Sequence, residues 1–317
     1  MTPVFLTIDT EFAWRHHAAG LPLADIYARS CEPAGVGVGY QLARLAEHGL
    51  RACFFVDPMP ALAFGIEPVR RLVGTILDAG QEVQLHCHPN WAGAVAGDRG
   101  AAHSAFELMR YPAEAQAALI RGARDLLIAA GAPAPVAFRA GSFGADEATL
   151  AALPPLGIRY DSSHCGSFVP DECRIALPPG QIAPVLHHDV VEVPVTVIEE
   201  HPARYRPVQV CALSTIEFRA ALAHAIAQRH AALTIVSHGF ELAGRAGTRA
   251  NRVHVRRFGA MCALLARHRD EAPTARFADL PVLSLGQEDR PLAPHLLRTR
   301  WRQAEQLWSN MVAERAA

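Results

Sequence analysis

Short runs of apolar and β-branched residues recur along the chain, and segments with helical spacing lie between them. The runs that predict strands are Val4–Asp9, Arg51–Val56, Glu82–His86, Pro135–Arg139, Ile158–Asp161, Val190–Thr196 and Leu233–His238. The segments that predict amphipathic helices are Val38–His48, Pro68–Ala79, Glu114–Ala130, Asp146–Leu153 and Ile216–Arg229. Strands that alternate with helices indicate βα units and a parallel sheet. About seven such units favour an α/β fold of the distorted (β/α)7 barrel type, with parallel strands.

Reactive side chains gather where these strands end. The residues at or just past the C-terminal end of an expected strand are Asp9, Glu11, His86, His88, Arg139, Asp161 and His238. Barrel enzymes build their active sites on that face, from the ends of several strands. The placement therefore predicts one catalytic site assembled from distant segments.

Two pairs of these residues have the spacing of a metal site. Side chains at i and i+2 on a strand point to the same face, so His86 and His88 present two imidazoles, and Asp9 and Glu11 present two carboxylates. Two nitrogens and one carboxylate, with open positions, form the ligand set of a catalytic divalent metal such as zinc. The same donors also suit cobalt, nickel, iron and manganese. We expect a divalent metal, with Zn²⁺ as the first choice.

The C-terminal segment has a helical pattern of its own. Apolar residues at three- and four-residue steps mark an amphipathic helix within residues 294–317, namely Leu297, Trp301, Ala304, Trp308 and Met311. We expect a catalytic barrel over residues 1–285 and a helical extension over 286–317 that packs on it. The alternative for its apolar face is a contact in a homodimer.

Composition narrows the class of protein. With 317 residues, half of them hydrophobic, the chain can bury the core of a single large barrel. The formal net charge of −1 argues against a nucleic-acid partner. No apolar run long enough for a transmembrane helix and no secretory signal is apparent, and the seven cysteines read as reduced thiols, which together suggest a cytoplasmic protein.

Five segments, taken in order, resemble the motifs of the polysaccharide deacetylases (NodB homology, carbohydrate esterase family 4). These segments are Leu6–Glu11, Glu82–His86, Phe138–Phe143, Asp161–Ser163 and Ile235–His238, and Ala52–Val56 resembles the second strand of the family. Two positions depart from the family pattern. The adjacent aspartates of the family are replaced by Asp9-Thr10-Glu11, and Asn90 stands where the second histidine is usual, which leaves His88 as the second ligand by strand geometry. The departures indicate a divergent branch.

The resemblance implies a role for each residue. Asp9 would be the general base and Glu11 a metal ligand, although the two could be exchanged or both could bind metal. Arg139 would hold Asp9 ionised. His238 would be the general acid, oriented by Asp161. Trp91 either forms a wall on which a sugar stacks or is a core aromatic residue.

The expected reaction is the metal-dependent removal of an N-acetyl group from an amino sugar of a surface polysaccharide or its precursor. Alternatives are a hydrolase of another C–N bond, in a formamide or ureide, and a sugar-binding protein without activity. The arginines after His238 could hold an acidic sugar or a phosphate, or simply form a charged face; they are Arg245, Arg249, Arg252, Arg256 and Arg257. The pairs His16-His17 and His187-His188 are interpreted as solvated side chains.

Overall fold

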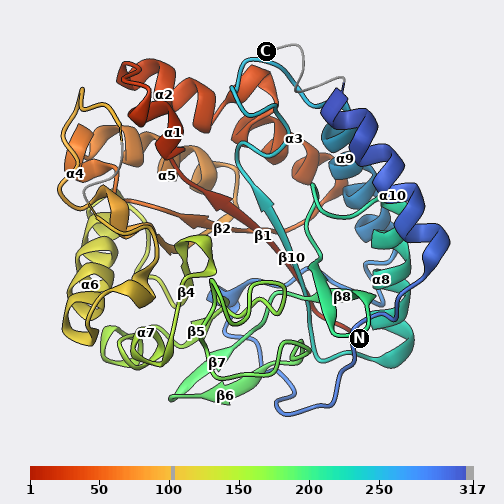
Figure 1. Cartoon of the computed structure of the whole chain (residues 1–317). Coiled ribbons are helices and arrows are strands. Elements are labelled where there is room, and N and C mark those ends of the chain that lie inside the picture. Colours follow the sequence, from red (N-terminus) through yellow and green to blue (C-terminus); the bar gives the residue numbers. More distant parts are fainter. Residues whose placement is uncertain (101–103, 312–317) are drawn as a thin grey trace.

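The structure is a computed structural model that describes residues 1–100 and 104–311. Its main sheet has eight strands in the order β10-β1-β2-β3-β4-β5-β7-β6, and helices surround it (Figure 1). All neighbours in this sheet are parallel except β6 and β7. The strands are β1 (Val4–Thr10), β2 (Cys53–Val56), β3 (Glu82–Cys87), β4 (Ala137–Ala140), β5 (Tyr160–Asp161), β6 (Val185–His187), β7 (Val190–Glu192) and β10 (Leu233–His238). A separate antiparallel pair consists of β8 (Val197–His201) and β9 (Arg204–Pro207).

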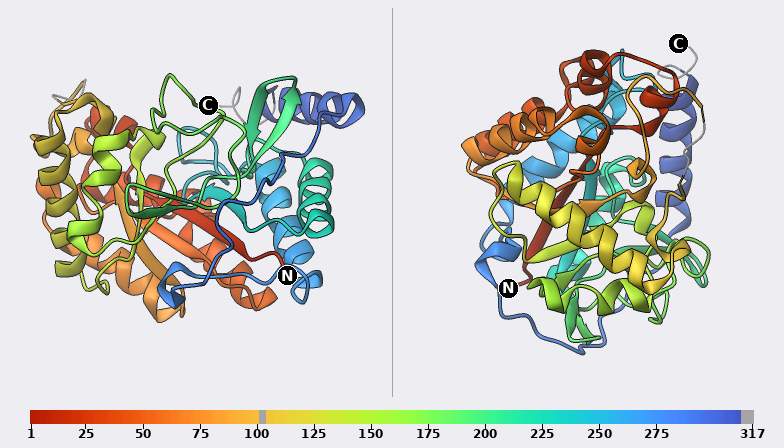
Figure 2. Two further views of the ribbon diagram at one scale, coloured as in Figure 1. Left: turned by 90° about the horizontal axis from the view of Figure 1, so that it is seen from below. Right: turned by 90° about the vertical axis from the view of Figure 1, so that its left-hand side faces the viewer.

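The helices cover the outer side of the curled sheet (Figure 2). The α-helices are α1 (Trp14–Ala18), α2 (Leu23–Ser30), α3 (Val38–His48), α4 (Ala61–Phe64), α5 (Glu67–Asp78), α6 (Ala113–Ala129), α7 (Glu147–Ala151), α8 (Thr215–Gln228), α9 (Arg252–Arg267) and α10 (Leu296–Ser309). Among the described residues, no helix is long and apolar enough to cross a membrane.

Alternation along β1 explains how the sheet carries both a core and a site. Leu6 and Ile8 belong to the large apolar cluster that includes residues of the outer helices, whereas Phe5 packs in a second cluster with Phe55 and Phe277. Residues at even spacing share a face, so the side chains that follow Phe5 at steps of two continue along the inner face. The inner face is therefore apolar at the start of β1 and polar at its C-terminal end.

The sheet closes only in part. The ladder ends at β10 on one edge and at β6 on the other. Single backbone hydrogen bonds bridge the gap, from the Thr196 amide to the Thr234 carbonyl (3.1 Å) and from the Val236 amide to the Val208 carbonyl (3.0 Å). The fold is thus a distorted barrel whose parallel strands all end at one rim.

This architecture confirms the expected α/β barrel with seven parallel strands and a C-terminal helix. The expected strand over Val190–Thr196 ends at Glu192, and the antiparallel strand β6 and the β8–β9 pair were not predicted. β6 contains only three residues, one of them exposed, so it lacks the apolar run that marks a buried strand. Helix α9 was also missed because its charged start, with arginines at 252, 256 and 257, hides its apolar positions.

The C-terminal helix α10 packs on the rest of the fold, but not through its apolar stripe. Its buried residues are polar, namely Thr299, Arg302 and Ser309. Trp301 and Trp308 are 54% and 62% exposed. The side chain of Arg302 reaches Glu200 and Glu217, and Glu305 pairs with Arg257 at 2.9 Å. Ion pairs and hydrogen bonds, rather than the apolar stripe, fix α10 to α8 and α9.

Candidate metal-dependent active site

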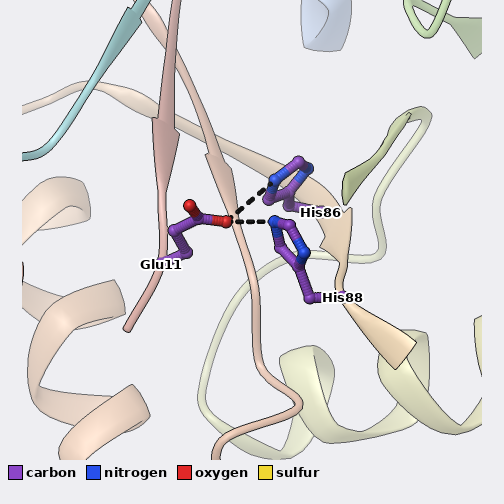
Figure 3. Close-up of side chains that lie close together, drawn as sticks. All are labelled: Glu11, His86 and His88. Atoms are coloured by element: carbon purple, nitrogen blue, oxygen red, sulfur yellow. Dashed lines mark ion pairs between the residues drawn. The ribbon is translucent and has the colours of Figure 1, made fainter. Parts of the chain in front are cut away.

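Three side chains with metal-ligand atoms converge at the rim of the sheet. Glu11 follows β1, His86 lies in β3 and His88 follows β3 (Figure 3). Glu11 Oε2 lies 3.4 Å from His86 Nε2 and contacts His88 Nε2. The two imidazole rings are nearly perpendicular, at 85°, with centroids 4.9 Å apart. One carboxylate oxygen and two ring nitrogens thus point at a common position.

The charges of these groups suit a bound cation. His86 Nδ1 lies 2.8 Å from the Arg139 carbonyl oxygen, which can only accept, so Nδ1 carries the proton and Nε2 keeps its lone pair. Burial would raise the pKa of Glu11, but the charge of His88 and hydrogen bonds to both histidines outweigh it and hold that pKa well below its usual value. Burial would lower the pKa of His88, yet the Glu11 charge raises it to about 9. The carboxylate charge is therefore matched to positive charge at this position, which a divalent cation also supplies.

Asp9 lies beside this group and is paired with a buried arginine. Its Oδ1 accepts a hydrogen bond from Arg139 Nη1 at 2.7 Å, and both side chains are almost wholly buried. Arg139 also donates to Thr7 Oγ1 and to the carbonyl oxygen and hydroxyl of Ser162, and its guanidinium lies over the Phe55 ring. Because all three nitrogens of the guanidinium donate hydrogen bonds, its position is fixed, and so is the position of Asp9 Oδ1.

His238 reaches Asp9 from the other side of β1. Its Nε2 lies 3.9 Å from Asp9 Oδ2, the oxygen that Arg139 leaves free. On the opposite side of the ring, Nδ1 lies 3.4 Å from Gln209 Nε2, which also donates to Glu241 Oε1 at 2.8 Å. The Gln209 amide thus contacts the ring on the side away from Asp9, and Nε2 faces the site. Gln209 and Glu241, neither of which was predicted, therefore orient His238.

Asp161 does not take the place expected for it. Its two carboxylate oxygens accept hydrogen bonds from the Ser163 amide and the Ser163 hydroxyl, each at 2.8 Å. Burial and the charge of Asp161 raise the pKa of Glu192 well above its usual value, which favours a proton shared between the two carboxyl groups. Ser163 Oγ in turn accepts from the Ala140 amide. Through Ser163, Asp161 thus stabilises the end of β4, next to Arg139. The residue that contacts the His238 ring is Gln209 instead.

A further buried carboxylate, Asp57, was not predicted from the sequence. It follows β2 directly and is 1% exposed. Its Oδ1 accepts from the Met59 amide, whereas Oδ2 has no hydrogen-bond partner among the described residues. Burial raises the pKa of Asp57 to about 6, although the nearby His88 and His86 oppose the shift. The rule that identified the other rim residues, a polar side chain directly after an apolar strand, would have found it.

A cavity of about 610 Å³ opens over Glu11 and His88. Aromatic side chains line it, among them Trp14, Phe106 and Phe240. Trp91 also lines it but is only 1% exposed, because its ring packs against Trp14, Phe64 and His17. The expected sugar-stacking wall is therefore not Trp91, which is a core residue behind the cavity; the half-buried Trp14 is the more accessible indole.

A second cavity of about 490 Å³ adjoins the first, and Arg15, Gly244 and Arg245 line both. The second cavity is also bordered by Arg29 and Arg249. Burial lowers the pKa of His16 to about 4, and the charges of Arg15 and Arg29 contribute. His16 and His17, interpreted from the sequence as solvated, are in fact 4% and 2% exposed. The site thus has an extension with concentrated positive charge.

The predicted arginine group is divided by the fold. Arg245 and Arg249 border this extension, whereas Arg256 and Arg257 pair with Glu305 of α10. Arg257 is buried, and the side chain of Arg252 lines a groove between α9 and α10. The group is therefore partly a ligand-facing surface and partly an anchor for the C-terminal helix.

No protein-family model matches the chain, and no curated protein matches it. Solved structures do share its fold. A protein from Mycobacterium smegmatis, provisionally designated a polysaccharide deacetylase, superposes with a TM-score of 0.55 at 19% identity and covers 91% of this chain and 94% of its own. A family 4 carbohydrate esterase from Streptomyces lividans gives a TM-score of 0.45 at 13% identity and covers 93% of this chain and 98% of its own. The chain thus shares its fold with the provisionally designated polysaccharide deacetylase from M. smegmatis, as its motifs predicted, at a low sequence identity.

Proposed function

We propose that the protein is a metal-dependent hydrolase that removes N-acetyl groups from an amino sugar of a surface polysaccharide or its precursor. The observation that carries the proposal is the placement of one metal-ligand group, Glu11, His86 and His88, beside the Asp9–Arg139 ion pair and His238. The fold is that of proteins designated as polysaccharide deacetylases, which agrees with this reaction.

Glu11, His86 and His88 would hold the metal, with zinc as the first choice and cobalt, nickel, iron or manganese as alternatives. When bound, a divalent metal polarises an amide carbonyl and lowers the pKa of water. Glu11 is the ligand and Asp9 the base because Glu11 Oε2 faces both imidazoles, whereas Asp9 Oδ1 is occupied by Arg139.

Asp9 Oδ2 accepts the proton of the attacking water as the C–O bond to the acetyl carbon forms. Arg139 holds Asp9 in position through the hydrogen bond to Oδ1. The C–N bond then breaks while His238, protonated on both ring nitrogens in this step, donates its Nε2 proton to the nitrogen and becomes neutral; the nitrogen leaves as an amine, and acetate is released. Gln209 holds the His238 ring from its Nδ1 side, and Asp161 acts indirectly, through the end of the strand that carries Arg139.

We propose further that the substrate is acidic, and the arginines around the second cavity are the observation that supports this. Arg15 and Arg245 line both cavities; burial lowers the pKa of Arg15, the charge of Glu11 opposes this shift, and the charge of Arg245 adds to it. Arginines that repel one another are stabilised by a bound anion, and their planar groups suit phosphate and carboxylate. We infer that the sugar carries an anionic group that reaches from the metal ligands to Arg29 and Arg249.

The test is acetate release from acetamido sugars, with and without a phosphate, by metal-loaded protein. Replacing Asp9→Asn or His238→Gln should each lower kcat by about 10² to 10⁴, the usual contribution of a general base or acid. Asp270→Asn, a change at an exposed residue, is the matched control and should keep parent activity. Parent-like turnover by both site variants would overturn the assignment. Formate or ammonia in place of acetate would reveal a different C–N bond, and saturable sugar binding without any product would indicate a binding protein.

We also propose that the exposed face of α10 binds a second copy of the chain. Leu297, Trp301, Ala304, Trp308 and Met311 follow the alternating three- and four-residue spacing of a coiled-coil seam, and the two tryptophans face solvent. A two-fold axis would pair this stripe with itself and cover it in both copies.

Sedimentation should therefore show a dimer that Trp308→Glu combined with Leu297→Glu converts to a monomer. Val282→Glu, at a fully exposed apolar residue outside α10, should leave the dimer intact. A monomeric parent protein at micromolar concentration would contradict the proposal.

A further inference from the structure

A second group of metal-ligand side chains lies away from the active site, at the edge of the sheet. Glu147 is the first residue of α7, and His187 and His188 lie at the end of β6 and in the turn to β7. His187 Nε2 lies 2.9 Å from Glu147 Oε2, and His188 Nε2 contacts the same oxygen. The three ligand atoms all lie within 4.8 Å of one another. The two histidines, interpreted from the sequence as solvated, are therefore partners of one carboxylate.

The backbone brings these rings together in an unusual way. Neighbouring residues of a strand point to opposite faces, so His187 and His188 should diverge. His188 and Asp189 instead have positive φ angles, 50° and 60°, in the two-residue turn between β6 and β7. Because of this turn, both Nε2 atoms face Glu147, with ring planes at 83° and centroids 4.9 Å apart. A conformation that most side chains avoid thus serves to aim two imidazoles at one point.

The carboxylate is also fixed. Glu147 Oε1 accepts a hydrogen bond from the Ala176 amide at 2.6 Å, and α7 begins with a capping box between Asp146 and Thr149. Glu147 Oε2 remains directed at the histidines. The three side chains are 23% to 43% exposed, so water has access to the remaining positions around a bound ion.

We propose that Glu147, His187 and His188 form a second site for a divalent transition metal, separate from the active site. Two imidazoles and one carboxylate favour zinc, nickel or copper over magnesium or calcium, which prefer oxygen donors. The site joins the start of α7 to the β6–β7 hairpin, two segments that are 40 residues apart in the sequence. Its metal ties down the edge of the sheet and takes no part in hydrolysis.

The experiment counts metal ions in purified protein that has been stripped and reloaded with Co²⁺ or Zn²⁺, by elemental mass spectrometry and by the visible absorption of Co²⁺. The parent should bind two equivalents. His86→Ala/His88→Ala should bind one, and His187→Ala/His188→Ala should also bind one. His268→Ala removes a single imidazole that pairs with Glu271 and should keep both equivalents, which makes it the matched control.

The milder variant Glu147→Gln provides a second measurement if the double histidine variant does not fold. It keeps the shape of the side chain and should lower the affinity of the second site at least tenfold, with an unchanged far-UV circular dichroism spectrum. The proposal is overturned if His86→Ala/His88→Ala binds no metal, or if Glu147→Gln and His187→Ala/His188→Ala both keep two equivalents with parent affinity. Because the count does not depend on activity, its result is independent of the proposed deacetylation.

Discussion

Two groups of side chains in this molecule have the same donors and nearly the same mutual geometry. In both, two imidazoles at about a right angle, with centroids 4.9 Å apart, face one glutamate. The groups differ in their surroundings. Glu11, His86 and His88 are 3% to 14% exposed and lie beside Asp9, Arg139 and His238, whereas the Glu147 group is 23% to 43% exposed at the sheet edge. The donor set alone therefore predicts a metal site, and only the neighbouring acid, base and cavity indicate catalysis.

The origin of the two groups differs as well. In the first group, strand geometry brings the side chains together. His86 and His88 are two residues apart at the end of β3, and β1 places Glu11 beside them. In the second, a turn with positive φ brings together adjacent residues that a strand would separate. A buried strand end holds its side chains in one position, while a hairpin at the edge can open locally. This contrast suits a reaction centre in one case and a structural tie in the other.

The largest expected effect separates the two groups by activity. His86→Ala/His88→Ala should lower acetate release by at least about 1000-fold, because the loss of metal removes several kcal/mol of transition-state stabilisation. His187→Ala/His188→Ala should change it less than about twofold, since these residues touch no part of the proposed reaction site. Steady-state kinetics of both variants, at saturating metal, is the measurement. Equal losses of acetate release in the two variants would contradict the proposal that only the first group is catalytic.

A site residue of this molecule can be predicted from the sequence where the residues next to it in the chain mark its position. The residues at the rim follow apolar strands, so Asp9, His86 and His238 could be placed on one face before the fold was known. Asp57 obeys the same rule and could have been included. Gln209 and Glu241 could not, because they act on His238 from a loop and a turn that carry no periodic pattern.

The second group shows the same limit. His187 and His188 are adjacent in the sequence, but their carboxylate partner lies on another element. The positive φ at His188 could not be predicted either, because no glycine stands at that position. Helix α10 was misread for a different reason. Its apolar spacing predicted burial, whereas its polar side meets Glu200 and Glu217, and only the tertiary contacts show which side is covered.

A smaller effect should distinguish the charged extension of the active site from its reaction centre. Arg245→Ala should raise KM for a phosphorylated acetamido sugar by about tenfold, since a hydrogen bond to a charged group contributes roughly 1.5 to 3 kcal/mol. It should leave kcat, and KM for the neutral sugar, nearly unchanged, because Arg245 lines the two cavities whereas Asp9 and His238 do not. Kinetics with the two sugars, repeated at high salt, is the check. Arg298→Ala is a control on α10, and an equal rise of KM for both sugars would argue against an anion subsite.

The smallest expected effect is thermal, and it isolates the second group. In the His86→Ala/His88→Ala background, zinc at about 100 times its Kd should stabilise the folded state by about 2.7 kcal/mol. With an unfolding entropy of about 2.1 cal/mol/K per residue, this corresponds to a rise in Tm of about 4 °C. Adding Glu147→Gln should abolish most of the rise, because the remaining imidazoles lose the carboxylate that completes the site. Calorimetry with and without zinc measures both. A rise that persists in the triple variant would place the stabilising metal elsewhere, and the two groups would then share only their geometry.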